Sequence, residues 1–220
     1  MVLLSLYLKK KIQIKICGIT NLACMKAAID CEVEYIGLVF FNKSPRYVSF
    51  EKTKDLLKIR NNHSKIVALT VDPDEILLSQ IMDFIQPDFI QLHGQETPER
   101  CKEIRNKFDV SIIKGIGIKN KQQLTISKAE FELVSDILLL DAPSSDLPGG
   151  NGNSFNWNIL RDYNFKKKWM LAGGINLSNV KDALETANPP VIDVSSGVEV
   201  KKGIKCPELI QEFVTKCRNI

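Results

Sequence analysis

The sequence has few of the residues that build metal and redox sites. It contains six cysteines and two histidines among 220 residues, and no cysteines show C-x-x-C spacing or have a histidine beside them. Zinc sites and dithiol redox motifs need such close spacing. A chain of this length can also build a core without disulfides, so we expect reduced thiols, a cytoplasmic location and no metal.

Strong charge of one sign and long apolar runs are absent as well. The 30 basic residues nearly balance the 26 acidic ones, and the net charge of +4 is spread along the chain without a basic arm for nucleic acid. The N-terminal apolar run precedes its lysines, the reverse of a signal peptide, and is too short to span a membrane, which takes about 20 residues. We expect small-molecule partners, no nucleic acid and no membrane, and interpret residues 1–10 as an N-terminal extension.

Two kinds of apolar segment alternate along the remaining chain. Short β-branched runs predict strands, and longer stretches with helical spacing predict helices. The strand runs are too apolar to leave one face in water, which favours a parallel sheet covered by helices. The predicted strands are residues 12–17, 35–40, 65–71, 88–93, 111–118, 136–142, 169–173 and 191–197, and the predicted helices are 21–31, 50–60, 74–86, 97–107, 120–129, 156–162, 177–186 and 206–218.

Eight strand-helix units in a chain of this length favour a single α/β domain, a closed (β/α)8 barrel over residues 11–220, with an open doubly wound sheet as the alternative. The longest irregular stretch, residues 142–156, is long enough to suggest a functional loop. Helix start signals occur at Asn21, Ser49, Asp72-Pro73 and Thr97-Pro98.

Two strand ends carry residues suited to proton transfer. In such a barrel the site forms at the C-terminal ends of the strands, where Cys17 ends the first predicted strand and Asp141 follows the apolar run of the sixth. The structural alternatives are a buried apolar thiol for Cys17 and, for Asp141, a carboxylate that caps a helix or pairs with a nearby amide. As a base, the thiol needs its pKa of about 8.5 lowered by a dipole or cation. Asp141 would be the acid, and Gly18 leaves space for a ligand beside Cys17.

Small residues follow the last two predicted strands, at Gly173-Gly174 and Ser196-Gly197. Loops at these two positions commonly bind phosphate in this fold, through exposed backbone N–H groups and a helix N-terminus. Glycine needed only for backbone geometry is the alternative. The pair predicts a phosphorylated substrate.

Two further polar residues follow strands. Arg46 lies between Pro45 and Tyr47 after the second strand, and its planar guanidinium suits a carboxylate if it is not simply a solvated charge. His93 follows the fourth strand at the barrel mouth, where it has either a structural or a substrate-facing role. His63 lies in a turn at the opposite end, and we assign it no function.

Seven segments combine these residues in chain order: KICGIT (15–20), GLVFFNKSPRYVS (37–49), QLHGQE (91–96), LLLDA (138–142), GGNGNSFNW (149–157), LAGGINLSNV (171–180) and DVSSGVE (193–199). Together they resemble the phosphoribosylanthranilate isomerase family, the barrel enzymes of tryptophan biosynthesis. The resemblance extends from about residue 12 to the end of the chain.

The resemblance implies an isomerase that converts N-(5'-phosphoribosyl)anthranilate to the carboxyphenylamino-deoxyribulose phosphate by an Amadori rearrangement. Asp141 would protonate the ribose ring oxygen, and Cys17 would remove the C2 proton. This chemistry needs no metal and no redox cofactor, and the enzyme would be a monomer or a homodimer. Arg46 would bind the anthranilate carboxylate, His93 and Asp193 would lie near the substrate, and Gly173, Gly174, Ser196 and Gly197 would contact the phosphate.

Some positions depart from the family pattern. Asn153 and Asn156 stand where Lys and Asp are usual, although Asn156 can still cap a helix starting at Trp157. The third strand differs around Thr70 and Asp72, which predicts a different lining of the mouth there.

Two alternative functions fit a barrel of this kind. One is a two-substrate isomerase serving histidine and tryptophan synthesis, in which an aspartate would be expected at the position of Cys17. The other is a barrel that binds a phosphorylated metabolite without converting it. Cys17 argues against the first, and the presence of Cys17, Asp141 and Arg46 together argues against the second.

Overall fold

Eight parallel strands close into a barrel in chain order, β1 to β8, with each strand paired to the next and β8 paired to β1. The computed structural model describes residues 11–143, 154–161 and 163–220. The predicted barrel is confirmed, and the open sheet is excluded. The strands are β1 (Gln13–Cys17), β2 (Tyr35–Val39), β3 (Lys65–Thr70), β4 (Phe89–Leu92), β5 (Ser111–Gly117), β6 (Ile137–Asp141), β7 (Lys168–Leu171) and β8 (Val191–Val194).

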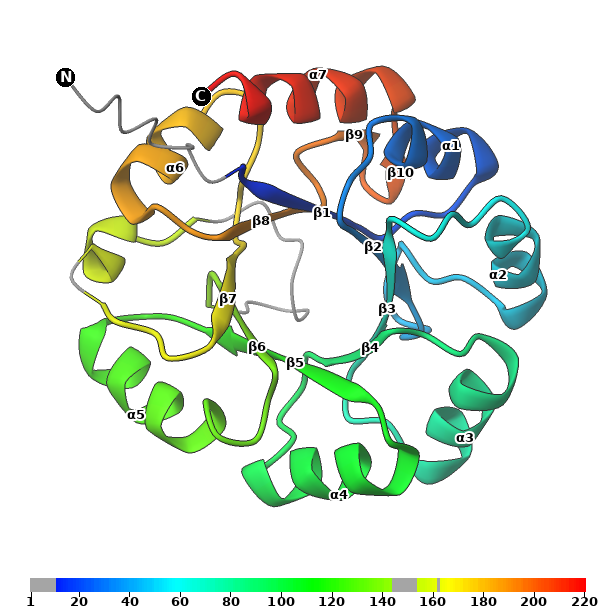
Figure 1. Cartoon of the computed structure of the whole chain (residues 1–220), viewed down its shortest axis with the longest axis horizontal. Helices are drawn as coiled ribbons and strands as arrows, with labels where there is room; N and C mark the ends of the chain where they lie inside the picture. Colours follow the sequence, from blue (N-terminus) through cyan, green and yellow to red (C-terminus); the bar gives the residue numbers. More distant parts are fainter. Residues whose placement is uncertain (1–10, 144–153, 162) are drawn as a thin grey trace, which may run out of the picture.

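Helices surround the ring of strands and cover its outer face (Figure 1). Most of the predicted strands extend beyond the observed C-terminal ends of β1 to β8, because the sequence pattern continues into the mouth loops after the strand-to-strand hydrogen bonds end. The α-helices are α1 (Leu22–Asp30), α2 (Phe50–Leu57), α3 (Glu75–Phe84), α4 (Pro98–Phe108), α5 (Lys121–Phe131), α6 (Val180–Ala187) and α7 (Pro207–Arg218).

The connection after β6 differs from the prediction. In place of a helix over 156–162, the structure has one 3-10 helix, η1 (Trp157–Leu160). The side chain of Asn156 accepts a hydrogen bond from the Asn158 N–H, so the predicted cap is confirmed on a shorter element. Residues 1–10 and most of the predicted functional loop, including Asn153, lie outside the described residues.

Three of the four predicted helix starts are confirmed. Asn21, Ser49 and Thr97 each accept a hydrogen bond from a backbone N–H of the first turn. The signal at Asp72 was wrong by two residues, because Asp74 caps α3 instead. Asp72 adopts a φ of 45° and accepts a hydrogen bond from the Gln95 N–H, joining two mouth loops.

A short hairpin between β8 and α7 was not predicted. Its strands, β9 (Glu199–Lys201) and β10 (Ile204–Lys205), pair antiparallel. They are too short and too polar to show a strand period. The hairpin packs against the loop after β2, where a Cβ on Gly203 would lie 2.6 Å from the Pro45 carbonyl oxygen. This contact brings β9 next to Arg46.

The buried apolar side chains of the described residues form three clusters. One lies between the strands and the helices, a second lies within the barrel, and a third, small one contains Cys17. Side chains alternate along a strand, so the residues two positions beyond the inner cluster also point inward, toward the mouth. The inner cluster comprises Tyr35, Val67, Ile113, Ile137, Leu139, Met170, Ala172 and Val191.

No helix within the described residues is long and apolar enough to cross a membrane. The same part of the chain contains no group of three His, Cys, Asp or Glu side chains arranged to hold a metal ion.

Candidate active site

A cavity of about 620 Å³, including the part open to solvent, lies at the C-terminal ends of the strands. We call it the mouth cavity. Polar groups converge on it from five strands and the loops after them, as is common in small-molecule sites. Of the predicted site residues, Gly197 does not line it; those that do are Cys17, Arg46, His93, Asp141, Gly173, Gly174, Asp193 and Ser196.

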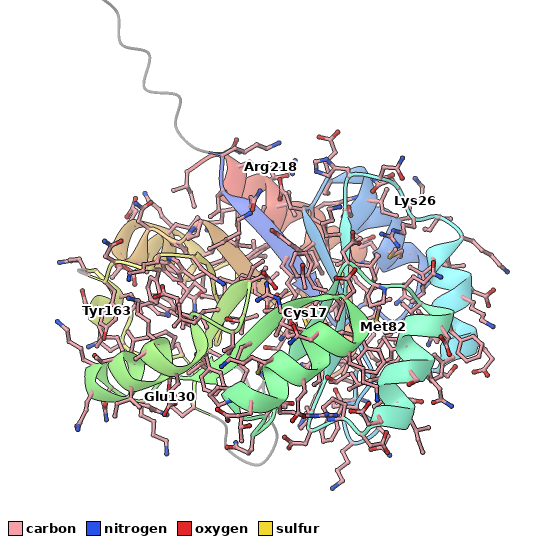
Figure 2. The ribbon with its side chains drawn as sticks, turned by 60° about the horizontal axis from the view of Figure 1, so that its bottom comes forward. Cys17, Lys26, Met82, Glu130, Tyr163 and Arg218 are labelled. Carbon is pink, nitrogen blue, oxygen red and sulfur yellow. The ribbon has the colours of Figure 1, made fainter. Side chains whose placement is uncertain are left out.

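Cys17 ends β1 and lies near the middle of the molecule, whereas the labelled Lys26 and Glu130 lie at its periphery (Figure 2). The thiol is buried and packs with Val39 and Leu69. Burial raises the pKa of the Cys17 thiol, because it removes solvent from the thiolate, although the Lys15 ammonium opposes this. The site thus contains a cation of the kind that the sequence interpretation required, although the pKa of the thiol stays raised overall because burial outweighs it.

Lys15 and Asp193 form a buried ion pair beside Cys17. Their strands are in register at this position, and Lys15 Nζ lies 3.0 Å from Asp193 Oδ1. Burial by itself would lower the pKa of Lys15, but Asp193 and Cys17 raise it. Burial raises the pKa of Asp193, and Lys15 opposes that shift. The predicted substrate-facing residue Asp193 therefore already has a protein partner.

Asp141, the last residue of β6, belongs to a second polar group. His93 Nε2 lies 3.3 Å from Asp141 Oδ2, and Gln91 Nε2 lies 2.9 Å from His93 Nδ1. An amide NH₂ can only donate, so Nδ1 accepts, and in neutral His93 the hydrogen lies on Nε2, the nitrogen nearer the carboxylate. Asp141 Oδ1 also accepts from the Ala142 N–H at 2.7 Å, which is the amide partnership considered as its structural alternative. Both oxygens are therefore oriented.

Gln91 also brings an acceptor to the cavity. Its side chain is buried, and Oε1 has no hydrogen-bond partner among the residues that the structure describes. A buried unpaired carbonyl oxygen is unfavourable unless a ligand or water bonds it. A substrate hydroxyl is a suitable donor.

Arg46 reaches the cavity from the loop after β2. Its Nε and Nη2 donate to the two carboxylate oxygens of Glu199 at 2.7 and 3.0 Å, which fixes the guanidinium plane. Burial opposes ionisation of Glu199, but Arg46 and Lys205 lower its pKa overall. The sequence interpretation of Gly18 was wrong: a Cβ there would lie 2.7 Å from Arg46 Cδ, so the space belongs to Arg46 and not to a ligand.

The two glycine loops lie side by side at the predicted phosphate position. Gly173 and Gly174 have φ values of 85° and 63°, which favour glycine. Asn176 and Asn179 both donate to the Gly174 carbonyl, at 3.0 and 2.9 Å, and so fix the first loop. Gly197 forms a bridge with Asn176, which joins the loops without lining the cavity.

Sequence reasoning missed several polar residues of this site. Lys15 and Gln91 are two positions before Cys17 and His93 on their strands, so strand period alone would have placed them inward. No such signal marks Glu199, because its hairpin was not predicted. Near the departures at Thr70 and Asp72, the residues that line the cavity are Leu69 and Val71.

The chain matches one known protein family over most of its length. Residues 14–216 match the family model described as N-(5'phosphoribosyl)anthranilate (PRA) isomerase. A relative from Rhodopseudomonas palustris, named N-(5'-phosphoribosyl)anthranilate isomerase, is 38% identical over 210 residues, which are 94% of this chain and 96% of the relative.

Solved structures agree with the sequence comparison. Phosphoribosyl anthranilate isomerase from Thermotoga maritima superposes with a TM-score of 0.84 at 28% identity, covering 95% of this chain and 100% of that one. A second structure, with a TM-score of 0.80, 28% identity and the same coverage, is an isomerase in complex with reduced 1-(o-carboxyphenylamino)-1-deoxyribulose 5-phosphate.

Proposed function

The chain belongs to the N-(5'-phosphoribosyl)anthranilate isomerase family, and we propose that its mouth cavity performs this isomerisation of tryptophan biosynthesis by general acid-base catalysis. One observation carries the assignment of roles. A thiol from β1 and a carboxyl group from β6, Cys17 and Asp141, line the same cavity between a cationic loop and two glycine loops. An aldose-to-ketose rearrangement needs one acid and one base acting on neighbouring atoms.

In the first step, protonated Asp141 donates its proton to the ring oxygen of the ribose. The bond between C1 and the ring oxygen breaks as the anthranilate nitrogen forms a double bond to C1. The carboxylate left behind accepts the hydrogen bond from His93 Nε2, which lies 3.3 Å away. His93 thus stabilises the charge that forms on the acid.

In the second step, the thiolate of Cys17 removes the proton from C2, and the electron pair moves to give an enolamine. The enolamine takes up a proton at C1 while its C2 hydroxyl loses one, so the product is a ketone that is an isomer of the substrate. Proton exchange then removes the proton from Cys17 and returns one to Asp141. These steps use no metal, cofactor or oxidant.

Arg46 and the glycine loops hold the two ends of the substrate in this proposal. The guanidinium lines the cavity with its plane fixed by Glu199, and a planar cation suits the anthranilate carboxylate. The phosphate would bind the loops that follow β7 and β8, with Gly173, Gly174 and Ser196 at the cavity and Gly197 behind them.

The proposal includes a cytoplasmic location and assembly as a monomer or a homodimer. All six cysteines are unpaired, which fits the reducing cytoplasm. Every residue of the proposed site comes from one chain, so the proposal holds for a monomer and for a homodimer.

Turnover tests the proposal directly. The purified chain is mixed with phosphoribosylanthranilate formed in situ from anthranilate and phosphoribosyl pyrophosphate, and the loss of anthranilate-type fluorescence is followed. The double variant Cys17→Ser/Asp141→Asn measures spontaneous breakdown of the substrate. A rate no higher than this background with fresh substrate would contradict the proposal, and substrate binding without turnover would show a binding barrel instead.

A further inference from the structure

Lys15 is a charged side chain in an unusual place. It lies in the middle of β1 with none of its surface exposed, and it is among the largest fully buried side chains of the described residues. Removing an ammonium group from water is unfavourable, and one ion pair does not reliably offset that cost. An apolar residue would fill this position without that cost, so packing alone does not account for Lys15.

The strand geometry places this cation beneath Cys17. The two residues are two positions apart on β1, so both side chains point into the barrel. Asp193 lies opposite Lys15 on β8 and holds its ammonium at 3.0 Å. The ammonium therefore has a fixed position one layer below the thiol.

The other surroundings of Cys17 offer little compensation for a thiolate. Val39 and Leu69 pack against it from β2 and β3. Besides Lys15, the charged groups that act on its pKa are Asp193, which raises it, and Lys205, which lowers it.

Those other cations are already engaged. Lys205 Nζ bonds Glu199 at 3.0 Å and the Ser195 carbonyl at 2.9 Å, and Arg46 is ion-paired with Glu199. Lys15 is itself paired with Asp193, but it lies on the same strand as Cys17, two residues away, and points into the barrel with it. Lys15 is therefore the cation best placed to act on the thiol from inside the barrel.

We infer that Lys15 is a positioning residue for the proposed reaction: its ammonium, held by Asp193, stabilises the thiolate form of Cys17 that removes the C2 proton. The catalytic part of this role rests on the proposed function. The effect of Lys15 on the Cys17 thiol can be measured without substrate. The alternative is a purely structural ion pair, and the barrel contains a second pair for comparison.

That second pair is Lys114–Glu96, which provides a matched control. Its atoms are 2.7 Å apart, and both side chains are buried to a similar degree. Lys114 extends from β5 to the carbonyl groups of Leu92 and Gly94, and it is absent from the interactions that act on Cys17. A merely structural contribution would make the two pairs behave alike.

The experiment measures the pH at which Cys17 becomes alkylated by iodoacetamide, resolved from the other cysteines by peptide fragmentation in a mass spectrometer. In Lys15→Met the midpoint should rise by about one pH unit or more, because an opposite charge in contact shifts a pKa by about 1–3 units. Lys114→Met should leave the midpoint unchanged.

A double variant covers the case in which Lys15→Met fails to fold. Lys15→Met/Asp193→Asn leaves no unpaired buried charge, and its midpoint should also rise, because Lys15 acts on the thiol more strongly than Asp193 does. Lys114→Met/Glu96→Gln is its control. An unchanged midpoint in the Lys15 variants, or an equal rise in the Lys114 variants, would overturn the inference.

Turnover adds a kinetic signature. At neutral pH, kcat/KM of Lys15→Met should fall about tenfold for each unit of midpoint shift, and the deficit should narrow as the pH rises and thiolate forms. A deficit that stays constant with pH would contradict the role. Absence of turnover in the wild-type chain would refute the proposed function alone, since the alkylation measurement would still decide whether Lys15 stabilises the thiolate.

Discussion

The two ends of the barrel use carboxylates in different ways. At the end where the strands begin, a carboxylate just before an even-numbered strand accepts a backbone N–H from the preceding strand. These bonds, each 2.8 Å long, are Ile14 N–H to Glu34, Ile66 N–H to Asp88 and Ile112 N–H to Asp136.

At the mouth, three carboxylates pair with ionisable side chains of the proposed site. Asp193 pairs with Lys15, Glu199 with Arg46, and Asp141 with His93. The carboxylates at the strand starts also pair with cations, as Asp88 does with Arg60 and Asp136 with Arg105, but they join neighbouring strands at the end away from the mouth cavity. Substitutions at the mouth should therefore change turnover, while substitutions at the strand starts should change stability.

The largest effect is expected at the mouth, for Asp141→Asn. Asparagine keeps an acceptor for the Ala142 N–H but has no acidic proton to give to the ring oxygen. We expect kcat to fall by about 10²–10⁴-fold, the usual contribution of a positioned acid, without a loss of unfolding free energy. Steady-state fluorescence assays and urea denaturation measure the two quantities. A wild-type kcat would remove Asp141 from the mechanism.

Arg46→Lys should affect binding more than chemistry. Lysine keeps a positive charge for Glu199 but loses the planar pair of donors. Loss of one charged hydrogen bond, worth about 1.5 kcal/mol, corresponds to a rise in KM of about tenfold. The same fluorescence assay over a substrate series gives KM, and an unchanged value would count against the carboxylate assignment.

Asp88→Ala tests the other end of the barrel. The substitution leaves the Ile66 N–H without its acceptor and removes the partner of Arg60, whose Nη2 lies 2.7 Å from the carboxylate. The free energy of unfolding should fall by about 1–3 kcal/mol, while kcat stays at the wild-type value. A reduced kcat in the folded variant would break the division between the two ends.

The smallest effect is expected on the outer surface. Lys26 and Asp30 form an exposed pair one turn apart on α1, at 2.8 Å. Lys26→Ala should change the free energy of unfolding by at most about 0.5 kcal/mol and leave kcat unchanged. A larger loss in urea denaturation would show that surface pairs contribute to the fold as much as the bonds at the strand starts.

Strand and helix order was predictable because each unit carries its own period. Buried parallel strands read as continuous apolar runs, and caps such as Ser49 mark helix starts locally. The hairpin that carries Glu199 was not predictable, since its strands are stabilised by contacts with the loop after β2, far away in the sequence. The short length of η1 was not predictable either, because the helical pattern in the sequence continues beyond Leu160, where this helix ends.

Cys17, Asp141 and Arg46 were found because strand ends define the mouth of a barrel. Their partners were not, because an ion pair such as Lys15–Asp193 depends on the closure of β8 against β1, which no local pattern reports. The error at Gly18 has the same origin: the space beside it was visible in the sequence, but its occupant, Arg46, was not.

The central claim is that the mouth of this barrel is a site of acid-base chemistry with Cys17 as the base. It is tested most directly by kcat for Cys17→Ser, measured by loss of substrate fluorescence beside the wild-type chain. The account predicts a fall of about 10²–10⁴-fold in a variant that unfolds at the same urea concentration as the wild type. A folded Cys17→Ser variant with wild-type kcat would contradict it.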